Sequence, residues 1–528
     1  MWCNTTGKPV RPSRPSRSHQ WYYCQQEVPV RLYELSVLKT ASDLQVIPFN
    51  CPNIELKNPN NSEILVRIKD MPAFVEERDM PPQRDFRSWI CLVYTDKFLR
   101  LYSNKDAWEA IGDQTAEQFR FDIAASDEMK AKARELTADA KTPEEKLARL
   151  NAYCQSEYMN FDWIKSSATM EDRKKREEME DTQTAKATFK KHDGNGWDID
   201  RLFAALAKSL KFDVRIAESV SREDLTQIHT PKGYIFLNRI SVAVKVGDRW
   251  QFYTPSDCLG QVGLLSSEYE GALMFVCDED KSWFIAAPTA GAEKTQVTRT
   301  AHFSLDSDGT LEGDVQIQLT GHAAVRLKKK WWGDPREEAL KDMQDEISNR
   351  ISGAEITNYK ITNLDTLDMP VKIEYHIKAT GYAETTGTRL ILTPEFFEVG
   401  STSPFSGDVR RYPILFPYAS TTQDEITVTL PEGYTLDSPS APRNVGKPND
   451  IIGAQYTVAF HPKARTLTFR RTKVIGSDGS ILFNKDSFPI MKGIFEAMDR
   501  SDHHNFILKP VTATTPAAPA SATPAPQK

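Results

Sequence analysis

Residues 194–210 read GNGWDIDRLFAALAKSL, and this stretch decides the fold. Two glycines flank an asparagine, and a largely apolar run follows them. Phe203, Leu206 and Leu210 recur at helical spacing, which predicts the buried stripe of a core helix. The first turn of a helix has unpaired backbone N–H groups and the positive end of the macrodipole, so it favours an anion. The stretch therefore predicts a tight turn that enters a buried helix.

This turn resembles the nucleophile turn of the bacterial transglutaminase-like superfamily. In that superfamily the motif runs Gly-x-Cys-x-Asp into an apolar helix, whose start favours a thiolate. Gly194, Asp198 and the helix at residues 202–210 match this motif. Gly196 falls where the cysteine belongs, so the resemblance implies the fold of a cysteine enzyme without its nucleophile.

The superfamily's other catalytic elements are a histidine on the next strand and an aspartate at the end of the strand after it. Residues 233–246 alternate like a strand, residues 247–248 suit a two-residue hairpin turn, and residues 249–253 suit the return strand. The resemblance places Arg239 at the histidine position and Thr254 at the aspartate position.

The three substitutions together predict a protein that is not an enzyme. Gly196 has no side chain that could attack a carbonyl. Arg239 does not lose its proton near neutral pH and cannot act as a general base. Thr254 accepts a hydrogen bond but carries no charge to stabilise an imidazolium. We therefore expect Gly196, Arg239 and Thr254 to be vestigial triad positions.

The resemblance covers most of the chain. Residues 21–94 are similar to the later part of a β domain of unknown function that precedes the core in many bacterial envelope proteins, and residues 295–510 to a C-terminal β extension. The landmarks are QQEVPV (25–30), MPAFVEE (71–77), MPP (80–82) and LPEGY (430–434). The implied fold is α+β and multidomain, with a papain-like transglutaminase-type core flanked by antiparallel β-sandwich domains.

The expected division of the chain has five parts. They are a disordered leader (1–20), an N-terminal β domain that we expect to be truncated (21–125), the transglutaminase-like core (126–290), a C-terminal β region with one helix (291–510) and a disordered Ala/Pro/Thr tail (511–528).

Capping signals predict two further helices. Thr142 suits an N-cap, Pro143 a first turn and Glu145 a capping box, and apolar residues continue on one face to residue 158. Residues 334–353 predict the one helix of the C-terminal region, which ends at Gly353.

Composition agrees with a multidomain protein without a nucleic-acid partner. The chain has 528 residues, 40% hydrophobic and 27% charged, with a formal net charge of −6. The chain has no excess of basic residues that would indicate nucleic-acid binding, and it has no apolar run long enough to span a bilayer. No signal-peptide core lies near Met1, but the resemblance implies a periplasmic or cell-surface protein, because the truncation would remove an export signal.

Cysteine spacing predicts neither a disulfide framework nor a zinc site. The seven cysteines form no CxxC pair and no metal spacing; they are at positions 3, 24, 51, 91, 154, 258 and 277. Cys91, Cys154 and Cys277 are expected to be small buried hydrophobic residues. No cofactor or metal is expected.

A core without a nucleophile suggests a binding site in its place. An arginine facing a helix start offers bidentate donors beside free amides, which suits a carboxylate. The hypothesis places a pocket for a peptide or glycan at Arg239, Trp197, Asp198 and Asn238. In the simpler alternative, Arg239 pairs with Asp198, Asp200 or Asp193.

Two other readings stay open. In the first, Cys258 is a relocated nucleophile beside Asp257, with His192 or His229 nearby, and the protein is a cysteine-dependent acyl transferase or peptidase. In the second, the β domains act as a scaffold in the cell envelope, and Trp331 and Trp332 form an exposed aromatic anchor.

Overall fold

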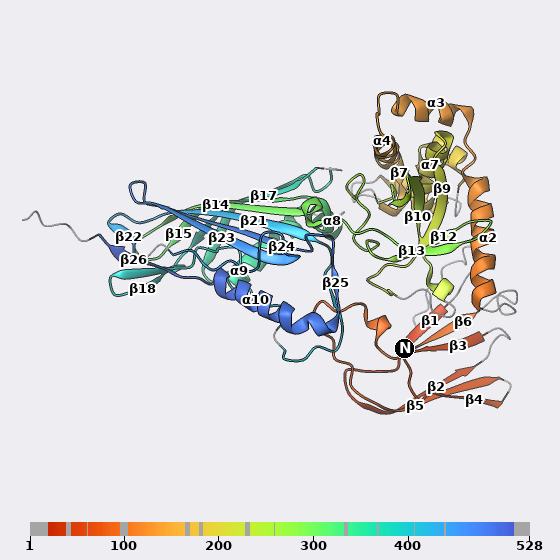
Figure 1. Cartoon of the computed structure of the whole chain (residues 1–528), viewed down its shortest axis with the longest axis horizontal. Coiled ribbons are helices and arrows are strands. Elements are labelled where there is room, and N and C mark those ends of the chain that lie inside the picture. Colours follow the sequence, from red (N-terminus) through yellow and green to blue (C-terminus); the bar gives the residue numbers. More distant parts are fainter. Residues whose placement is uncertain are drawn as a thin grey trace, which may run out of the picture.

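The computed structural model describes residues 19–38, 44–60, 62–94, 104–163, 169–178, 183–226, 233–257, 259–331, 336–366, 369–405, 407–437 and 440–511. They form a mixed α+β protein of three bodies, each with its own sheets. In Figure 1 the core lies beside the N-terminal sheets, and the C-terminal region extends away from both. The predicted leader and tail fall outside the described residues, except that residues 19–20 already belong to the first strand and residue 511 is described.

The N-terminal body consists of two three-stranded antiparallel sheets, ordered β1-β6-β3 and β2-β5-β4. The strands are β1 (His19–Tyr23), β2 (Val30–Leu38), β3 (Leu44–Phe49), β4 (Glu55–Asn60), β5 (Glu63–Met71) and β6 (Trp89–Tyr94), with a short 3-10 helix η1 (Gln83–Asp85) before β6. Side chains of β6 alternate between two clusters, because Ile90 and Leu92 pack with the second sheet while Trp89 and Cys91 pack with the core. The first sheet therefore lies between the second sheet and the core.

The core is a five-stranded antiparallel sheet ordered β11-β10-β9-β12-β13, with helices packed on it. The strands are β9 (Asp213–Ser219), β10 (Arg239–Val246), β11 (Arg249–Tyr253), β12 (Leu273–Cys277) and β13 (Trp283–Ala286). The helices are α2 (Asn104–Asp122), α3 (Asp127–Leu136), α4 (Pro143–Ser156), α5 (Met170–Glu178), α6 (Ala185–Lys191) and α7 (Gly196–Ser209). Two 3-10 helices, η2 (Phe161–Trp163) and η3 (Gly233–Phe236), and the parallel strand pair β7 (Met159–Asn160) and β8 (Asp193–Gly194) complete the core. Helix α7 contacts β9, β10, α3, α4 and α6, so it lies at the centre of the core.

Local sequence signals predicted most of these elements. The predicted start of α4 is confirmed, because Thr142 Oγ1 accepts a hydrogen bond from Glu145 N at 3.1 Å and Pro143 lies in the first turn. The Glu145 carboxylate accepts from Lys141 N at 2.6 Å, one residue before the expected donor. Residues 233–236 were expected to be strand but form a 3-10 helix, since all four are buried and do not alternate.

The expected domain boundary at residue 125 is wrong for helix α2. The Trp108 ring of this helix packs on Phe275 of the core, with ring centroids 4.7 Å apart, and Ile111, Phe119 and Ile123 join the same cluster. By its packing, α2 belongs to the core, so the boundary lies before residue 104.

The C-terminal region contains a seven-stranded sheet, ordered β16-β17-β15-β14-β21-β24-β23, and a four-stranded sheet, ordered β18-β19-β26-β22, which share one hydrophobic cluster. The strands are β14 (Gln296–Leu305), β15 (Leu311–Leu319), β16 (Ala354–Thr362), β17 (Val371–Ala379), β18 (Glu384–Thr386), β19 (Arg389–Leu392), β20 (Ile414–Leu415), β21 (Ser420–Thr429), β22 (Tyr434–Leu436), β23 (Ile452–His461), β24 (Thr466–Ile475), β25 (Leu482–Phe483) and β26 (Phe506–Pro510), and short 3-10 helices are η4 (Ala292–Lys294) and η5 (Lys485–Ser487). Strands β14 and β21 pair in parallel, and the other pairs of the large sheet are antiparallel.

The expectation of a single helix in this region is wrong. Its described part holds α8 (Gly321–Lys330), the predicted α9 (Arg336–Arg350) and α10 (Phe488–Asp502). Helix α8 follows Thr320, whose side chain makes no capping bond, so the usual start signal is missing. Helix α10 contains Pro489 and Gly493, which obscured the apolar face formed by its phenylalanines and methionines. Within the described residues, no helix has both the length and the apolar character needed to cross a membrane.

Candidate functional site

The turn at Gly196 is held by a capping box. Asn195 Oδ1 accepts a hydrogen bond from Asp198 N at 3.0 Å, and Asp198 Oδ2 accepts one from Asn195 N at 3.1 Å. Asp198 is fully buried, and its other oxygen accepts from Gln183 N at 2.7 Å. Asp198 was expected to line a binding pocket, but its contacts are those of a structural cap.

The space beside Gly196 is occupied. Gly196 N donates to Asp162 Oδ2 at 2.8 Å. A Cβ atom at Gly196 would lie 2.9 Å from Asp162 Oδ2 and 3.1 Å from Ser256 Cβ, both closer than normal packing. Any side chain at position 196 would therefore have to displace Asp162 or Ser256.

Ser256 links this turn to a buried carboxyl group on α7. Asp200 accepts hydrogen bonds from Ser256 N and Ser256 Oγ, each at 2.9 Å. Burial, and to a smaller extent the charges of Asp257 and Asp162, raise the pKa of Asp200 to about 7. Asp200 is only 2% exposed, so it supports the turn and is not accessible to a substrate.

Arg239 lies at the first position of β10 with an exposed side chain, and Asn238 beside it is also exposed. Among the described residues, the Arg239 guanidinium forms no ion pair, so the expected pairing with Asp198, Asp200 or Asp193 is not formed. Thr254 is half-buried, and its carbonyl accepts a hydrogen bond from Asp257 N at 2.9 Å.

A different arginine serves the α7 turn. Arg201 lies 3.1 Å from Asp122 and 3.9 Å from Asp198, and its guanidinium carbon is 5.9 Å from the Trp197 ring centroid. Trp197 is half-buried and packs against the core. In the structure, Trp197 and Asp198 therefore lie beside Arg201 of the same helix. Sequence reasoning missed Arg201, although its spacing of three residues from Asp198 was a signal for this contact.

Little open volume remains next to Thr254. A cavity of about 10 Å³ lies there, lined by ten residues: Asn151, Gln155, Phe252, Tyr253, Thr254, Asp257, Gly260, Gln261, Gly263 and Leu264. That volume holds about one water molecule. Cys258, the predicted alternative nucleophile, lies outside the described residues.

A large cavity lies where the three bodies meet, and we call it the junction groove. It has a volume of about 1090 Å³. Its walls come from Trp21, Tyr23 and residues 76–84 of the N-terminal body, residues 222–224 and 267–268 of the core, and residues 325, 326, 329 and 415–418 of the C-terminal region. None of these residues was expected to form a site.

Hydrogen bonds between the bodies build the groove walls. The buried Arg222 guanidinium donates to Ser267 O at 2.6 Å and also to the carbonyls of Phe416 and Pro417. Leu415 N donates to Asp79 O at 2.7 Å. Because these bonds join segments far apart in the chain, the groove depends on the docking of all three bodies.

Glu77 ties the N-terminal wall to the C-terminal region. Its carboxylate accepts from Arg411 N at 2.9 Å and from Tyr412 N at 3.2 Å, and lies 3.2 Å from Arg410 Nε. Burial raises the pKa of the neighbouring Asp79 carboxyl.

Charges of both signs line the groove. Lys329 forms ion pairs with Asp257 at 3.1 Å and with Glu268 at 3.4 Å. Burial by itself would lower the pKa of Lys329, but these two carboxylates raise it above its ordinary value. Exposed carboxylates at Glu76, Glu223 and Asp224 form no ion pair with any described residue. Arg84, Arg222 and Arg326 also line the groove without an ion pair to a described carboxylate, so its unpaired charges are of both signs.

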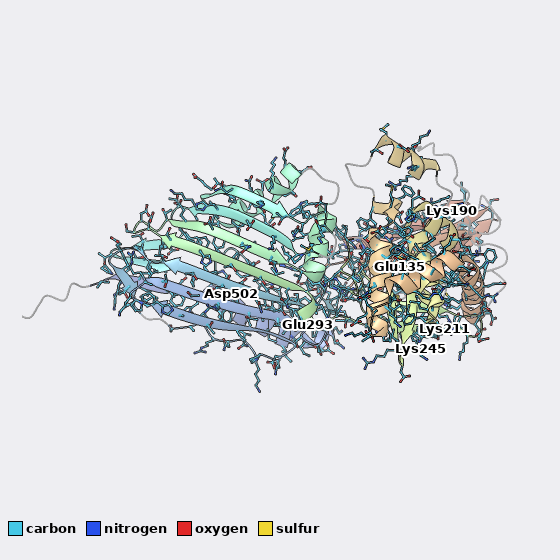
Figure 2. All side chains as sticks on the ribbon, turned by 90° about the horizontal axis from the view of Figure 1, so that it is seen from above. Glu135, Lys190, Lys211, Lys245, Glu293 and Asp502 are labelled. Atoms are coloured by element: carbon cyan, nitrogen blue, oxygen red, sulfur yellow. The ribbon has the colours of Figure 1, made fainter. Side chains whose placement is uncertain are left out.

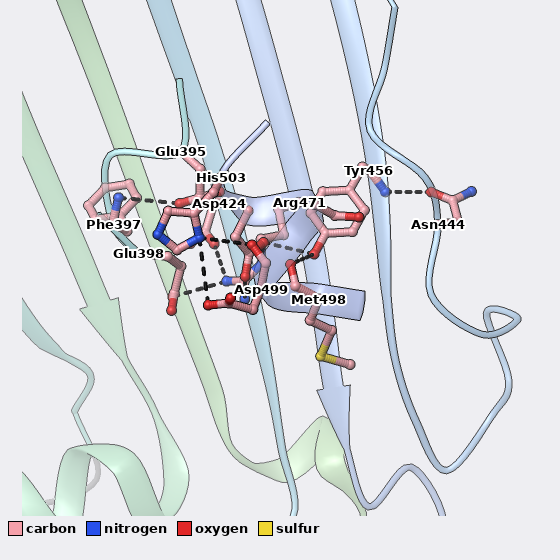
Figure 3. A network of polar contacts seen from close by, with 12 residues as sticks. Glu395, Phe397, Glu398, Asp424, Asn444, Tyr456, Arg471, Met498, Asp499 and His503 are labelled. Carbon is pink, nitrogen blue, oxygen red and sulfur yellow. Dashed lines mark hydrogen bonds and ion pairs between the residues drawn. The ribbon is translucent and has the colours of Figure 1, made fainter. Parts of the chain in front are cut away.

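A second polar cluster is buried in the C-terminal region (Figure 3). Arg471 lies 3.0 Å from Glu398, 3.1 Å from Asp424 and 2.9 Å from Asp502. Arg299 bonds Asp424 at 2.6 Å and Glu398 at 2.7 Å. Against the effect of burial, these two arginines hold the pKa of Glu398 down to about 2. Arg299 and Arg471 thus pair with three carboxylates, of which Asp502 is labelled in Figure 2, as in a structural network.

Other predicted sites can be compared with the structure. Trp331 is 6% exposed and packs in the hydrophobic cluster of the C-terminal region, so it is not half of an exposed aromatic anchor. Trp332 lies outside the described residues. Cys91, Cys154 and Cys277 are buried, as predicted. In the part of the chain that the structure describes, no group of three or more His, Cys, Asp or Glu side chains could hold a metal ion.

Comparison with known proteins gives one family match. Residues 388–508 match a family described as a domain of unknown function with solved structure (DUF3858). This segment runs from β19 to β26 and includes Glu398, Asp424, Arg471 and Asp502 of the buried network. The comparison with curated proteins gives no match.

Two crystal structures are similar at low identity. One, described as "a putative protease" from Parabacteroides distasonis ATCC 8503, aligns with a TM-score of 0.48 and 11% identity over 94% of this chain and 76% of that chain. The other, described as "a putative cysteine protease" from Cytophaga hutchinsonii, aligns with a TM-score of 0.19 and 13% identity over 45% of this chain and 75% of that chain. These similarities are too low to transfer an activity to this chain.

Proposed function

We propose that this chain is a catalytically inactive transglutaminase-like protein that acts as a binding or scaffold module in the bacterial cell envelope. The observation that carries the proposal is the occupied space at Gly196, where Asp162 and Ser256 fill the volume a nucleophile would need. The exposed Arg239 and the uncharged Thr254 support it, because neither residue can replace a histidine and aspartate pair.

Thiol labelling distinguishes this proposal from an enzyme that uses Cys258. An activated cysteine is largely thiolate at pH 7 and reacts much faster than an ordinary thiol. Native protein is treated with iodoacetamide at pH 7, and the labelling rate of each cysteine is read by peptide mapping. We expect Cys258 to react no faster than N-acetylcysteine. A rate ten times higher would favour the acyl transferase or peptidase.

We infer that ligand binding takes place in the junction groove and that the ligand is an extended polypeptide segment with basic side chains. The groove is of ligand-binding size. Glu76, Glu223 and Asp224 form no ion pair with a described residue, so among the charges of the groove these carboxylates are the ones that a cationic group can bind. The Trp21 ring, 39% exposed with the Arg84 guanidinium 4.1 Å from its centroid, adds an aromatic surface for the aliphatic part of a lysine or arginine.

Fluorescence anisotropy with an eight-residue peptide of alternating lysine and serine tests the groove. The double variant Glu223→Gln and Asp224→Asn removes two rim charges worth about 0.5–1 kcal/mol each, so we expect about five- to thirtyfold weaker binding. The matched control removes the adjacent, exposed acidic pair Asp127 and Glu128 on α3 and should leave affinity unchanged.

Three results would contradict this assignment. Equal affinity of the parent protein and the groove variant would exclude the rim carboxylates. Tighter binding of a glutamate and serine peptide would exclude a basic ligand. Weaker binding of Arg239→Ala, with the groove variant unaffected, would place the site at the predicted triad positions instead.

The compartment is proposed from the family resemblance alone. Fractionation of cells that produce the protein from its native gene, followed by immunoblotting of periplasmic and cytoplasmic fractions, tests it. Recovery in the cytoplasmic fraction only would contradict the envelope location.

A further inference from the structure

The ammonium group of Lys329 is held by the core, although Lys329 belongs to the C-terminal region. Lys329 lies on α8, and Figure 1 shows α8 at the end of this region that faces the core. Its Nζ atom is 3.1 Å from Asp257 Oδ2 and 3.4 Å from Glu268 Oε1. Nζ also donates to Ser266 Oγ at 3.4 Å and lies 5.6 Å from the centroid of the Trp163 ring. We call these four residues of the core the ammonium site.

The ammonium site lies next to the α7 turn. The two residues that fill the space beside Gly196 are Asp162 and Ser256. Trp163 and Asp257 of the ammonium site are their immediate neighbours in the chain. Helix α8 therefore delivers its ammonium group to the part of the core where the vestigial triad positions were expected.

The same site borders two cavities. Lys329 and Glu268 line the junction groove, whereas Asp257 lines the small cavity beside Thr254. A ligand in the junction groove therefore reaches the ammonium site as soon as the Lys329 side chain moves away.

The three consecutive lysines of α8, at positions 328–330, have different environments. Lys328 is 3% exposed, and its ammonium group donates to two backbone carbonyls of its own region. Lys330 is exposed and lies 3.5 Å from Asp342 of α9. The contact of Lys329, in contrast, crosses from the C-terminal region to the core.

The ion pairs of Lys329 can be exchanged at low cost. The side chain of Lys329 is 29% exposed and that of Glu268 is 26% exposed, and ion pairs that keep contact with solvent stabilise a protein only weakly. Two carboxylates face a single ammonium group, so the site keeps a negative charge. Asp257 Oδ1 is buried and accepts no hydrogen bond from a described residue. A second cation that approaches the site is therefore attracted to it even while Lys329 is in place.

We propose that Lys329 autoinhibits the junction groove, because its ammonium group occupies from within the chain the site that binds a lysine of the ligand. The ligand ammonium replaces that of Lys329 between Asp257 and Glu268, and Lys329 turns into solvent. One cation is exchanged for another, so the charge of the site is unchanged and no covalent bond forms or breaks. The inference rests on the proposed function, since the competing ligand is the basic segment proposed for the groove. Occupancy by Lys329 lowers the apparent affinity by the fraction of time that the site is closed.

Chemical complementation tests the ammonium site without a peptide. Lys329→Ala removes three methylene groups and the ammonium group, and propylammonium supplies the same set of atoms. We expect the midpoint of thermal unfolding of Lys329→Ala to rise by about 2 °C or more in propylammonium chloride, compared with sodium chloride at equal ionic strength. The parent and the matched control Lys330→Ala keep Lys329 in the site and should not respond.

Fluorescence anisotropy with the peptide of alternating lysine and serine tests autoinhibition. Lys329→Ala makes two carboxylates available, so we expect it to bind the peptide about five- to thirtyfold more tightly than the parent. Lys330→Ala removes the same charge from the same helix and should bind with the affinity of the parent. The second variant Lys329→Gln also removes the charge but fills the space, so it should bind the peptide more tightly and should not respond to propylammonium.

The two measurements separate this inference from the proposed function. Autoinhibition is overturned if the parent binds the peptide and Lys329→Ala binds it no more tightly, or if Lys330→Ala shows the same gain. The ammonium site is overturned if propylammonium raises the midpoint of Lys329→Ala no more than that of Lys330→Ala. Absence of peptide binding by the parent and by every variant, together with a response of Lys329→Ala to propylammonium, would contradict the function proposed for the groove and its autoinhibition while supporting the ammonium site.

Discussion

The substitution Asp200→Asn should make the protein more stable at alkaline pH than at acid pH, relative to the parent. Asp200 is buried beneath the α7 turn and bonds both the amide and the hydroxyl of Ser256. Its pKa is raised to about 7 from an ordinary value of 3.8, mainly by burial. A raised carboxyl pKa gives stability that is fully present below pH 3.8 and is lost as pH rises through about 7.

The size of the effect follows from that shift. Between pH 3.8 and 7 the folded protein holds a proton on Asp200 that the unfolded chain has released, so the free energy of unfolding falls as pH rises. Each pKa unit corresponds to 1.36 kcal/mol, so the shift of Asp200 amounts to at most about 4 kcal/mol. Asparagine cannot ionise, and its amide still accepts from Ser256 N. At pH 4.5 the parent has already lost about 1 kcal/mol of this, so the variant should gain about 3 kcal/mol on the parent between pH 4.5 and pH 8.5.

Urea denaturation at pH 4.5, 6, 7 and 8.5 measures this gain as the difference in free energy of unfolding between variant and parent. A constant offset reports the changed hydrogen bonds, and only the slope with pH reports titration. The control Asp127→Asn alters an exposed carboxyl whose pKa is lowered by its bond with Lys130, so its slope should be small and of opposite sign. A pH-independent difference for Asp200→Asn would refute the reasoning.

Three further predictions concern packing and buried charge. Arg471→Met should lower the free energy of unfolding by about 3–5 kcal/mol, because it leaves buried carboxylates without their cation. Arg470→Met removes only an exposed ion pair with a carboxylate of the adjacent β21, so it should cost less than about 1 kcal/mol. Urea denaturation at pH 7 compares the two variants. Gly196→Ala should cost about 1–3 kcal/mol by overpacking, while Gly493→Ala, where nothing lies within 4 Å, should raise stability by about 1 kcal/mol, as read from thermal unfolding. Arg222→Met should leave interdomain carbonyls without a donor and increase proteolysis between the core and the C-terminal region; unchanged fragment patterns would contradict this.

Elements with strong local signals could be predicted from the sequence. The helix α7, the hairpin turn at residues 247–248 and the cap of α4 each depend on a few neighbouring residues, and all three are present. The predicted stripe is wrong in one respect, because α7 is buried on all sides from residue 198 to 207 and Leu210 is a half-buried residue just after its end. Helices α8 and α10 were missed because their starts and interiors carry glycine, proline or a residue that makes no capping bond. Tertiary packing overrode these unfavourable local preferences.

The arrangement of the site could be predicted only in part. The position of Gly196 at a helix start follows from the local pattern. The neighbours that fill its space do not, because Asp162 is 34 residues earlier in the chain and Ser256 is on a loop after β11. The junction groove is formed by segments from all three bodies, so it cannot be predicted from any single stretch of the sequence.

The first turn of α7 shows how a helix start can keep its electrostatic balance without a thiolate. Its amides and macrodipole favour an anion, and two carboxylates of the chain supply it: Asp162 at the Gly196 amide and Asp198 in the capping box. A ligand anion at this turn would have to displace Asp162 and lose that hydrogen bond. A cationic ligand in the junction groove would instead meet Glu223 and Asp224, which give up no internal ion pair. The cationic ligand proposed for the groove would therefore break no ion pair of the described residues at these two carboxylates, whereas an anion at the turn would have to replace Asp162.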